Sequence, residues 1–225
     1  MIPDVLVHEL SDRMVRDECP ICAYIASRSH LEMDFLLYEN VNDGEIRNRF
    51  LCAGGFCLHH SKMLLDHGDP LGHAILYSHL LSLKIARVQG KKDSLSRDIC
   101  LFCSHESSHE QEYIRIFSNA WLDPDFSSQY RESGVLCLPH LFLVTKHLKE
   151  DHQCLESERL KKFTLEKYQE ISHNLAEIQR KSDSLSSREP WTEQENRAWR
   201  KVVSLLIDQG EYRRTTEEKL LHFQK

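Results

Sequence analysis

Eight side chains that bind soft divalent metals stand in two copies of one pattern, C-x2-C followed after a long gap by C-x2-H. The ligands are Cys19, Cys22, Cys57 and His60 in the first copy, and Cys100, Cys103, Cys137 and His140 in the second. Corresponding ligands lie 80 or 81 residues apart, which indicates an internal duplication. Three thiolates and one imidazole form the ligand set of a tetrahedral Zn²⁺ site. The sequence therefore predicts two metal sites, one in each copy.

The ligand type leaves the identity of the metal open. We expect two zinc ions, and an iron–sulfur cluster is the alternative cofactor. Four protein ligands leave no coordination position for water or substrate, so the zinc interpretation predicts a structural scaffold or interaction protein rather than an enzyme. The first alternative function is redox chemistry or sensing through a cluster or labile thiols. The two cysteines outside the pattern, Cys52 and Cys154, are expected to be buried free thiols.

Further histidines define a second alternative, a metalloenzyme that uses a separate histidine and carboxylate site. The candidate ligands are His67, His73, His79, His105 and His109. His105 and His109 lie four residues apart, about one helical turn, with glutamates nearby. The sequence shows no partner helix that supplies carboxylates to this pair, so a solvated face is favoured for it. His73 and His79 are six residues apart and share no helix face, so capping or surface roles are favoured for the first three histidines, although Asp66 and Asp69 lie nearby. His59 has Pro139 as its counterpart in the second copy, so we expect it at the helix surface or behind the ligand His60.

Composition restricts the class of protein. The chain has 225 residues, of which 40% are hydrophobic, and a net charge of −6. This charge disfavours nucleic acid as a partner, because binding to phosphate backbones depends on basic residues. No apolar run of about 18 residues and no basic leader is present, so we expect no membrane span and no secretory signal. We expect a cytoplasmic protein with protein partners, and a homodimer is one option. In this compartment, paired cysteines indicate metal rather than disulfides.

The hydrophobic pattern predicts an all-α fold, since glycine and proline are scarce and strand-like alternation is missing. We predict two pseudo-repeated helical units, each held by one metal site, with a C-terminal helical extension. The boundaries are 1–90 and 98–181 for the two units and 190–225 for the extension, packed as one compact whole. Long helices are predicted over 71–89 and 155–181. Thr192 and Glu195 form a capping box that begins the last helix.

Local signals place the ligands at helix ends. Asp17 and Asp98 each stand two residues before a C-x2-C pair and are predicted to cap the following helix. Each C-x2-H pair also precedes a helix, so each metal would join two helix N-termini, where the helix dipole stabilises thiolates. The predicted buried helix faces comprise Leu31, Phe35 and Tyr38 in the first copy, Ile114, Phe117 and Trp121 in the second, and Trp199, Val202, Val203 and Leu206 in the last helix.

Several short motifs in combination resemble a prokaryotic family of unknown function that carries the same duplicated cysteine and histidine pattern. The motifs are Cys19-Pro20-Ile21-Cys22, Gly55-Phe56-Cys57-Leu58-His59-His60, Asp69-Pro70-Leu71-Gly72, Cys100-Leu101-Phe102-Cys103, Gly134-Val135-Leu136-Cys137-Leu138-Pro139-His140 and Glu189-Pro190-Trp191. The resemblance extends from about Cys19 to Leu206. It implies the same metal ligands and a single whole-length unit, and it supplies no activity. Val135-Leu136 stands where the family pattern has Gly-Phe, which leaves the ligands intact.

Overall fold

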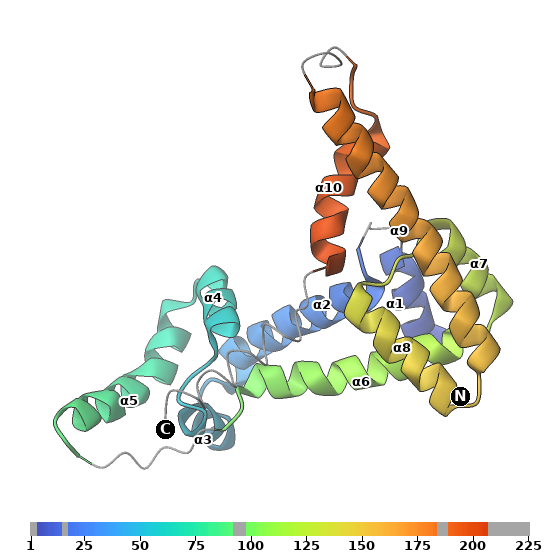
Figure 1. The fold of residues 1–225 in the computed structure, drawn as a ribbon. Coiled ribbons are helices and arrows are strands. Elements are labelled where there is room, and N and C mark those ends of the chain that lie inside the picture. The colour runs from blue at the N-terminus through green and yellow to red at the C-terminus, as the bar shows by residue number, and fades with distance from the viewer. Residues whose placement is uncertain (1–3, 15–17, 92–97, 184–188, 207–225) are drawn as a thin grey trace. The chain divides into compact units, whose positions relative to one another are not determined.

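The structure of the chain is a computed structural model that describes residues 4–14, 18–91, 98–183 and 189–206. These residues form α-helices and one π-helical segment and contain no strand, which confirms the all-α prediction (Figure 1). The elements are α1 (Asp4–Met14), α2 (Pro20–Phe35), η1 (Leu36–Asn40), α3 (Gly44–Cys52), α4 (Leu58–His67), α5 (Pro70–Val88), α6 (Leu101–Trp121), α7 (Pro124–Ser133), α8 (Leu138–Glu150), α9 (Cys154–Ser182) and α10 (Glu193–Leu206). Among the described helices, none is both long and apolar enough to cross a membrane.

The chain divides into two compact units that cut across the duplicated halves. The central unit is the continuous segment 25–110, and the split unit combines residues 1–24 with 111–225. Two helices contribute to both units, because α2 begins in the split unit and α6 begins in the central unit. The predicted boundaries at residues 90 and 98 separate the two copies of the sequence repeat. The boundaries of the compact units instead fall inside α2 and α6.

The split unit is built on aromatic side chains along α6. Trp121 and Phe117 are fully buried, and both rings meet Tyr130 of α7 edge to face at 5.5 and 5.7 Å between centroids. The indole nitrogen of Trp121 donates to the backbone carbonyl of Glu156 at 3.2 Å, which joins α6 to the start of α9. The buried face predicted for this helix is therefore confirmed. The long helix α9 then packs against both α8 and α10 (Figure 1).

The central unit has its own core around Phe50 of α3. The Phe50 ring is buried and meets Phe56 at 4.8 Å and Tyr77 of α5 at 5.1 Å between centroids. Gly55 directly precedes Phe56 in a left-handed conformation with φ of 106°, and a Cβ there would lie 3.0 Å from Leu80. A glycine is needed at this turn because both its φ and its contact with α5 exclude a side chain.

For two helices, the side predicted to be buried is the wrong one. Leu31, Phe35 and Tyr38 are 58%, 61% and 87% exposed, and α2 instead buries Met33 before passing into the π-helical segment, where Leu36 and Leu37 are buried. Apolar residues occur on both sides of this helix, so periodicity alone did not select the buried side. The wider turns of the π-helical segment η1, which follows α2, also change which residues share a face.

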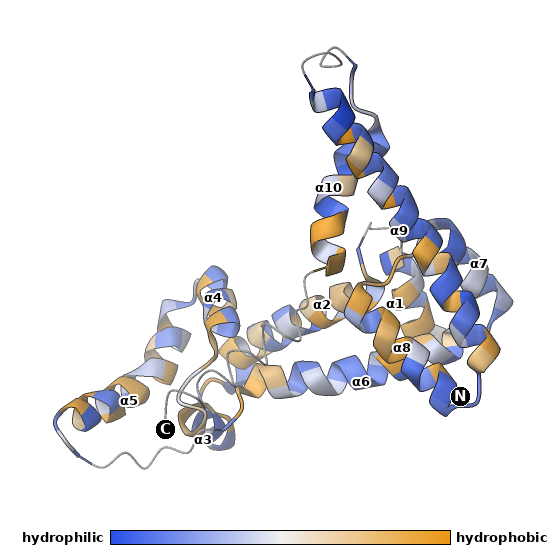
Figure 2. Cartoon of the chain, in the orientation of Figure 1, coloured by the Kyte–Doolittle hydropathy of each residue, from blue (hydrophilic) through white to orange (hydrophobic). Residues whose placement is uncertain are grey.

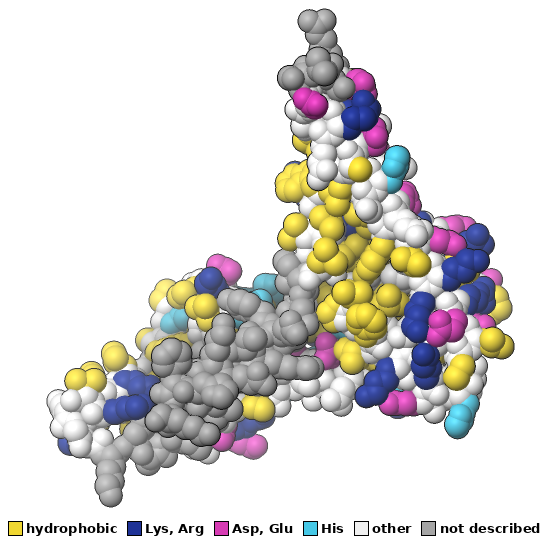
Figure 3. Space-filling view, viewed as in Figure 1, with side chains coloured by type: hydrophobic (Ala, Val, Ile, Leu, Met, Phe, Trp, Pro, Cys, Tyr) yellow, Lys and Arg dark blue, Asp and Glu magenta, His cyan; other side chains and the backbone are white. Residues whose placement is uncertain are grey.

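The last helix buries a different side from the one predicted. Its buried residues are Glu195, Ala198 and Leu205, and Val202 is half-buried. Trp199, Val203 and Leu206 are 47%, 54% and 57% exposed. Apolar side chains gather over α8, α9 and α10 in the space-filling view (Figure 3).

The start of α10 shows the predicted capping box. The backbone amide of Glu195 donates to Thr192 Oγ1 at 3.2 Å, and the Glu195 carboxylate accepts from the Thr192 amide at 2.8 Å. The same carboxylate receives two hydrogen bonds from Lys181 Nζ of α9, at 2.8 and 2.9 Å, and both side chains are buried. Glu195 therefore both caps α10 and fixes it to α9.

We predict that this pair makes the docking of α10 dependent on pH. The hydrogen bonds from Lys181, followed by that from the Thr192 amide, hold the pKa of Glu195 below its ordinary value. A carboxyl with a lowered folded-state pKa contributes stability above its unfolded pKa of about 4.3 and loses that contribution as the pH falls further. Amide hydrogen exchange in α10 should therefore accelerate below about pH 4 relative to α8.

The matched test is Glu195→Ala against Glu193→Ala at neutral pH. Glu193 lies on the exposed side of the same turn and pairs with Arg197. Exposed ion pairs of this kind contribute little to folding stability. Faster exchange in α10 is expected for Glu195→Ala only. Equal protection in both variants would contradict the assigned role of the buried pair.

Candidate metal centres

The eight predicted ligands gather into two groups of four. Centre A consists of Cys19, Cys22, Cys137 and His140, and centre B consists of Cys57, His60, Cys100 and Cys103. In each group the sulfur and nitrogen atoms all lie within 4.8 Å of one another. The predicted pairing within each copy is thus wrong, because each centre combines the C-x2-C of one copy with the C-x2-H of the other. Centre A lies wholly in the split unit and centre B wholly in the central unit.

The first residue of each C-x2-C or C-x2-H pair is a cysteine that stands at the N-terminal end of a helix. The helices α2, α4, α6 and α8 begin at the residue that follows Cys19, Cys57, Cys100 and Cys137, respectively. The carbonyl of each of these cysteines accepts the first hydrogen bond of its helix, at 2.8–3.0 Å. Centre A therefore lies at the N-termini of α2 and α8, and centre B at those of α4 and α6, which confirms the prediction that each group of ligands stands between two helix starts.

The cysteines occupy the capping positions that were assigned to aspartates. Asp98 lies two residues before Cys100 and hence ahead of the cap of α6, so the prediction that it caps this helix is wrong. Asp17 lies outside the described residues. A thiol at the cap lies next to the positive end of the helix dipole. This placement favours the thiolate form that binds metal.

The atoms of centre A surround a common point. His140 Nδ1 lies 3.4 Å from Cys19 Sγ, 3.2 Å from Cys22 Sγ and 3.1 Å from Cys137 Sγ. The sulfurs of Cys22 and Cys137 are 3.6 Å apart, far beyond the length of a disulfide. Cys19, Cys137 and His140 are buried and Cys22 is half-buried. The imidazole thus presents Nδ1, and not Nε2, to the three thiols.

Centre B repeats this geometry. His60 Nδ1 lies 3.1 Å from Cys57 Sγ, 3.6 Å from Cys100 Sγ and 3.5 Å from Cys103 Sγ, and the sulfurs of Cys57 and Cys103 are 3.6 Å apart. The ring of Phe102 stacks against His60 at 5.3 Å between centroids and shields one face of the imidazole. His60 and Cys100 are buried, whereas Cys57 and Cys103 are half-buried.

Close packing of three thiols has opposite effects on their pKa values. Hydrogen bonds from Cys100 and Cys103, strengthened by His60, hold the pKa of Cys57 well below its ordinary range. The same contacts raise the pKa of Cys103, because its proton is shared with neighbouring thiolates. In centre A, hydrogen bonds from Cys137 and Cys22 outweigh burial and lower the pKa of Cys19. A cation is therefore needed to hold all three thiolates of a centre deprotonated together.

Glu106 gives centre B a feature that the ligand pattern does not contain. Its carboxylate lies 3.2 Å from His60 Nε2, the imidazole nitrogen that faces away from the thiols, and it accepts a 2.7 Å hydrogen bond from Ser29 Oγ. Burial lowers the pKa of His60, but hydrogen bonds to Cys100, Cys57 and Glu106 raise it to about 11. A carboxylate behind a ligating histidine orients the ring and increases its basicity.

The sequence contained a signal for Glu106 that the motif analysis missed. Glu106 lies three residues after Cys103 on α6, so both side chains face the same side of the helix. The corresponding residue of the first copy is Ile25, which has no hydrogen-bonding side chain. The two centres thus share their ligand types, and the glutamate three residues after a C-x2-C pair occurs only beside centre B.

His59 lies on the exposed side of centre B. Its ring meets that of His60 at 4.9 Å between centroids, and the side chains of His59, His60 and Glu106 offer donor atoms within 4.8 Å of one another. His59 itself is exposed. This placement agrees with the expectation of a surface residue next to the ligand.

The remaining candidate histidines form two separate arrangements. His67 pairs with Asp34 at 2.7 Å, and His73 hydrogen-bonds to the backbone carbonyls of Asp69 and Leu64, the latter at 2.9 Å. His79 is exposed on α5. Among the described residues these histidines join no group of metal-binding side chains, which agrees with surface and capping roles.

His105 and His109 do have a partner helix, contrary to expectation. Glu32 of α2 accepts from His105 Nδ1 at 3.0 Å through one carboxylate oxygen and from His109 Nε2 at 2.6 Å through the other. Burial opposes ionisation of Glu32, but these two hydrogen bonds lower its pKa to about 2. The carboxylate lies between the imidazoles and bridges them, so the cluster connects α2 to α6 within the central unit.

The two cysteines outside the centres do not behave alike. Cys52 is half-buried near the side chain of Asn48, and Cys154 is exposed at the start of α9, so the expected burial of Cys154 is wrong. Neither cysteine belongs to a group of metal-binding side chains among the described residues.

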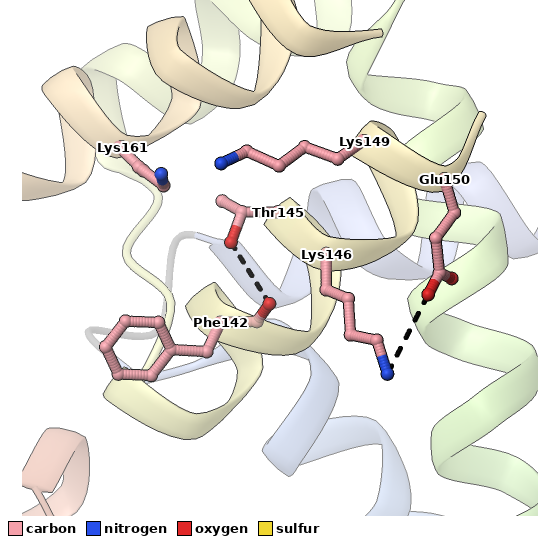
Figure 4. A pocket seen from close by; sticks show the side chains of 6 residues that line it. All are labelled: Phe142, Thr145, Lys146, Lys149, Glu150 and Lys161. Carbon is pink, nitrogen blue, oxygen red and sulfur yellow. Dashed lines mark hydrogen bonds and ion pairs between the residues drawn. The ribbon is translucent and has the colours of Figure 1, made fainter. Parts of the chain in front are cut away.

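An open pocket of about 400 Å³ lies between α8 and α9 of the split unit (Figure 4). Its lining residues are Phe142, Thr145, Lys146, Lys149, Glu150 and Lys161. The lysines pair with acids, since Lys146 lies 3.7 Å from Glu150, and Lys149 and Lys161 lie 3.4 and 2.8 Å from Glu158. The pocket contains none of the histidines or cysteines predicted to carry chemistry.

Comparisons with known proteins find a family of unknown function and an uncharacterized relative. The model of a family of unknown function (DUF6062) matches residues 7–99. A protein described as an uncharacterized 23.9 kDa protein in the xynA 3′ region of Caldicellulosiruptor sp. (strain Rt8B.4) is 33% identical over 196 residues, which cover 84% of this chain and 95% of that protein. No solved structure matches the chain.

The exchange of ligand pairs makes a prediction for double variants. Cys57→Ser with Cys103→Ser removes two ligands from centre B alone, so the protein should keep one metal ion per chain. Cys22→Ser with Cys57→Ser damages both centres and should leave none. If ligands paired within each copy, the second variant would keep one ion and the first would lose both. Metal content measured by mass spectrometry of the native protein distinguishes these outcomes.

A second prediction concerns Glu106. We expect Glu106→Ala to lower the metal affinity of centre B about 10- to 100-fold, because the ligating imidazole loses its acceptor. Centre A, which lies in the other unit, should be unchanged, so a chelator competition should resolve one fast and one slow ion. Glu112→Gln, an exposed acid on the same helix, is the control. Equal release from both centres in Glu106→Ala would contradict this role.

Proposed function

This chain belongs to the family of unknown function DUF6062, and we propose that it is a zinc protein whose two centres are structural. The observation that carries the proposal is the convergence of three thiol sulfurs and one imidazole nitrogen, twice, at the N-termini of paired helices. The protein would act as a metal-stabilised helical scaffold that presents surfaces to other proteins.

The spacing of the donor atoms supports a single ion at each centre. Four donors on a tetrahedron, with bonds of about 2.3 Å to sulfur and about 2.0–2.1 Å to nitrogen, lie roughly 3.5–3.8 Å apart. The sulfurs of Cys22 and Cys137 and those of Cys57 and Cys103 are both 3.6 Å apart, which fits this range, and the sulfur–nitrogen separations of 3.1–3.6 Å reach its lower end. An iron–sulfur cluster holds several irons and bridging sulfides, so its ligands must stand further apart than those of one ion.

The ligand set supports a structural role. Each centre offers four protein ligands, the number that closes a tetrahedral zinc site and leaves no position for water or substrate. Each also connects distant parts of its unit, since Cys22 and Cys137 are 115 residues apart and Cys57 and Cys103 are 46 apart. Closing such long loops removes chain entropy from the unfolded state. A structural zinc ion contributes on the order of 10 kcal/mol to folding.

The alternatives have less support. A thiol-based redox function would gain from a reactive cysteine next to a centre, but Cys52 and Cys154 stand outside both groups. A metalloenzyme would need a pocket lined by histidines and carboxylates, and the pocket between α8 and α9 is lined by three lysines and one glutamate, with no histidine. Reduced cysteines suit a reducing compartment, so we also propose a cytoplasmic location.

Elemental analysis with an absorbance spectrum of anaerobically purified protein tests this proposal. We expect two zinc ions per chain and no visible band, and loss of the folded state when a chelator removes the metal. The variant Cys52→Ser with Cys154→Ser is the matched control and should keep both ions. Iron with acid-labile sulfide would overturn the zinc assignment, and a metal-bound exchangeable water would overturn the structural one.

A further inference from the structure

Helix α5 of the central unit has two apolar faces. One face, with Gly72, Leu76 and Leu80, is buried against the core of the unit. On the opposite face lies a row of exposed residues, here named the α5 stripe, which consists of Leu71, Ala74, Ser78, Leu81, Ile85 and Val88. Leu71, Leu81, Ile85 and Val88 are 70%, 61%, 49% and 89% exposed. Figure 2 shows the hydrophobic character of α5 over much of its length.

The spacing of the α5 stripe is that of a coiled coil. Its residues are separated by 3, 4, 3, 4 and 3 positions, the alternation of the a and d positions of a heptad. This period of 3.5 residues keeps the row facing one partner helix over its whole length. With 19 residues at about 1.5 Å each, α5 spans roughly 28 Å, or five turns.

We propose that the α5 stripe is the interface of an antiparallel homodimer. The geometry points to a second copy because the stripe is complementary to itself. When two copies of α5 run in opposite directions about a twofold axis near its centre, Leu71 meets Val88 of the second copy. In the same register, Ala74 meets Ile85 and Ser78 meets Leu81.

Each layer of this antiparallel pair therefore combines an a residue with a d residue. The two small side chains, Ala74 and Ser78, fall opposite the branched side chains of Ile85 and Leu81. A parallel pair would instead place Ala74 against Ala74 and Ser78 against Ser78, which leaves gaps in two layers of the contact. Packing alone thus selects the antiparallel arrangement.

Charge selects the same orientation. α5 contains no acidic residue, and its formal charges, Lys84 and Arg87, lie in its last five residues, with Lys91 following. The segment before the helix carries Asp66 and Asp69. Antiparallel pairing brings the basic end of one copy next to the acidic start of the other, whereas a parallel pair brings like charges together. The two ends of α5 are about 28 Å apart, beyond the Debye length of about 8–10 Å, so charges at opposite ends hardly interact. The preferred orientation of the helix pair therefore depends on the charges that lie next to each other at each end.

The test is the mass of the full-length, metal-loaded protein in solution over a range of concentrations. We expect a dimer, and we expect Leu81→Glu or Ile85→Glu to weaken it at least tenfold while the chain keeps two metal ions and its helical content. Leu155→Glu is the matched control, because Leu155 is an 87% exposed leucine at the start of α9. A monomer at all concentrations, or a dimer that both α5 variants leave intact, would overturn the proposal.

Orientation is tested by disulfide formation in a Cys154→Ser background. Protein carrying Ala74→Cys is mixed with protein carrying Ile85→Cys and exposed to oxidised glutathione. An antiparallel pair places these two positions in one layer, so only the mixture should form a covalent dimer. Covalent dimers in each protein alone would indicate a parallel pair and overturn the antiparallel assignment.

Discussion

The arrangement of three thiols and one imidazole around a common point is the constraint on which the rest of this structure depends. Sulfur atoms 3.6 Å apart cannot all carry charge without a cation between them. Helix N-termini reduce the cost of that charge, because their free amides and dipole favour thiolates. The cap position of four helices is occupied by cysteine, so the first turns of α2 and α8 meet at centre A and those of α4 and α6 meet at centre B.

The exchange of ligand pairs between the two copies explains why the compact units do not coincide with the duplicated halves. A C-x2-C pair begins α2 or α6, and both of these helices extend from one unit into the other. Each C-x2-H pair begins a shorter helix that stays within its unit. The duplicated sequence thus supplies two equivalent pairs of each kind. The centres then differ in their surroundings, since Glu106 lies behind His60 whereas the first copy has Ile25 at the corresponding position.

Metal binding also bears on the apolar faces that this fold leaves uncovered. A unit held by a tightly bound ion needs a smaller hydrophobic core, because the ion provides folding free energy directly. Helices such as α5 and α10 can then bury one face and keep apolar side chains on another, as Leu81 and Trp199 show. Exposed apolar rows of this kind are typical of surfaces that bind other proteins.

The sequence by itself determined the helical fold and the eight candidate ligands. Residue type decides which side chains can bind a soft metal, the repeat distinguishes His60 from His59, and a short-range pattern such as Thr192 with Glu195 fixes a helix start, because these depend on residue type and on neighbours along the chain. Only the tertiary structure decided which ligand pairs meet, which side of α2 is buried and that Glu32 joins two histidines. Equivalent repeats offer the same short-range signals for either pairing, so the choice between them depends on how distant helices pack.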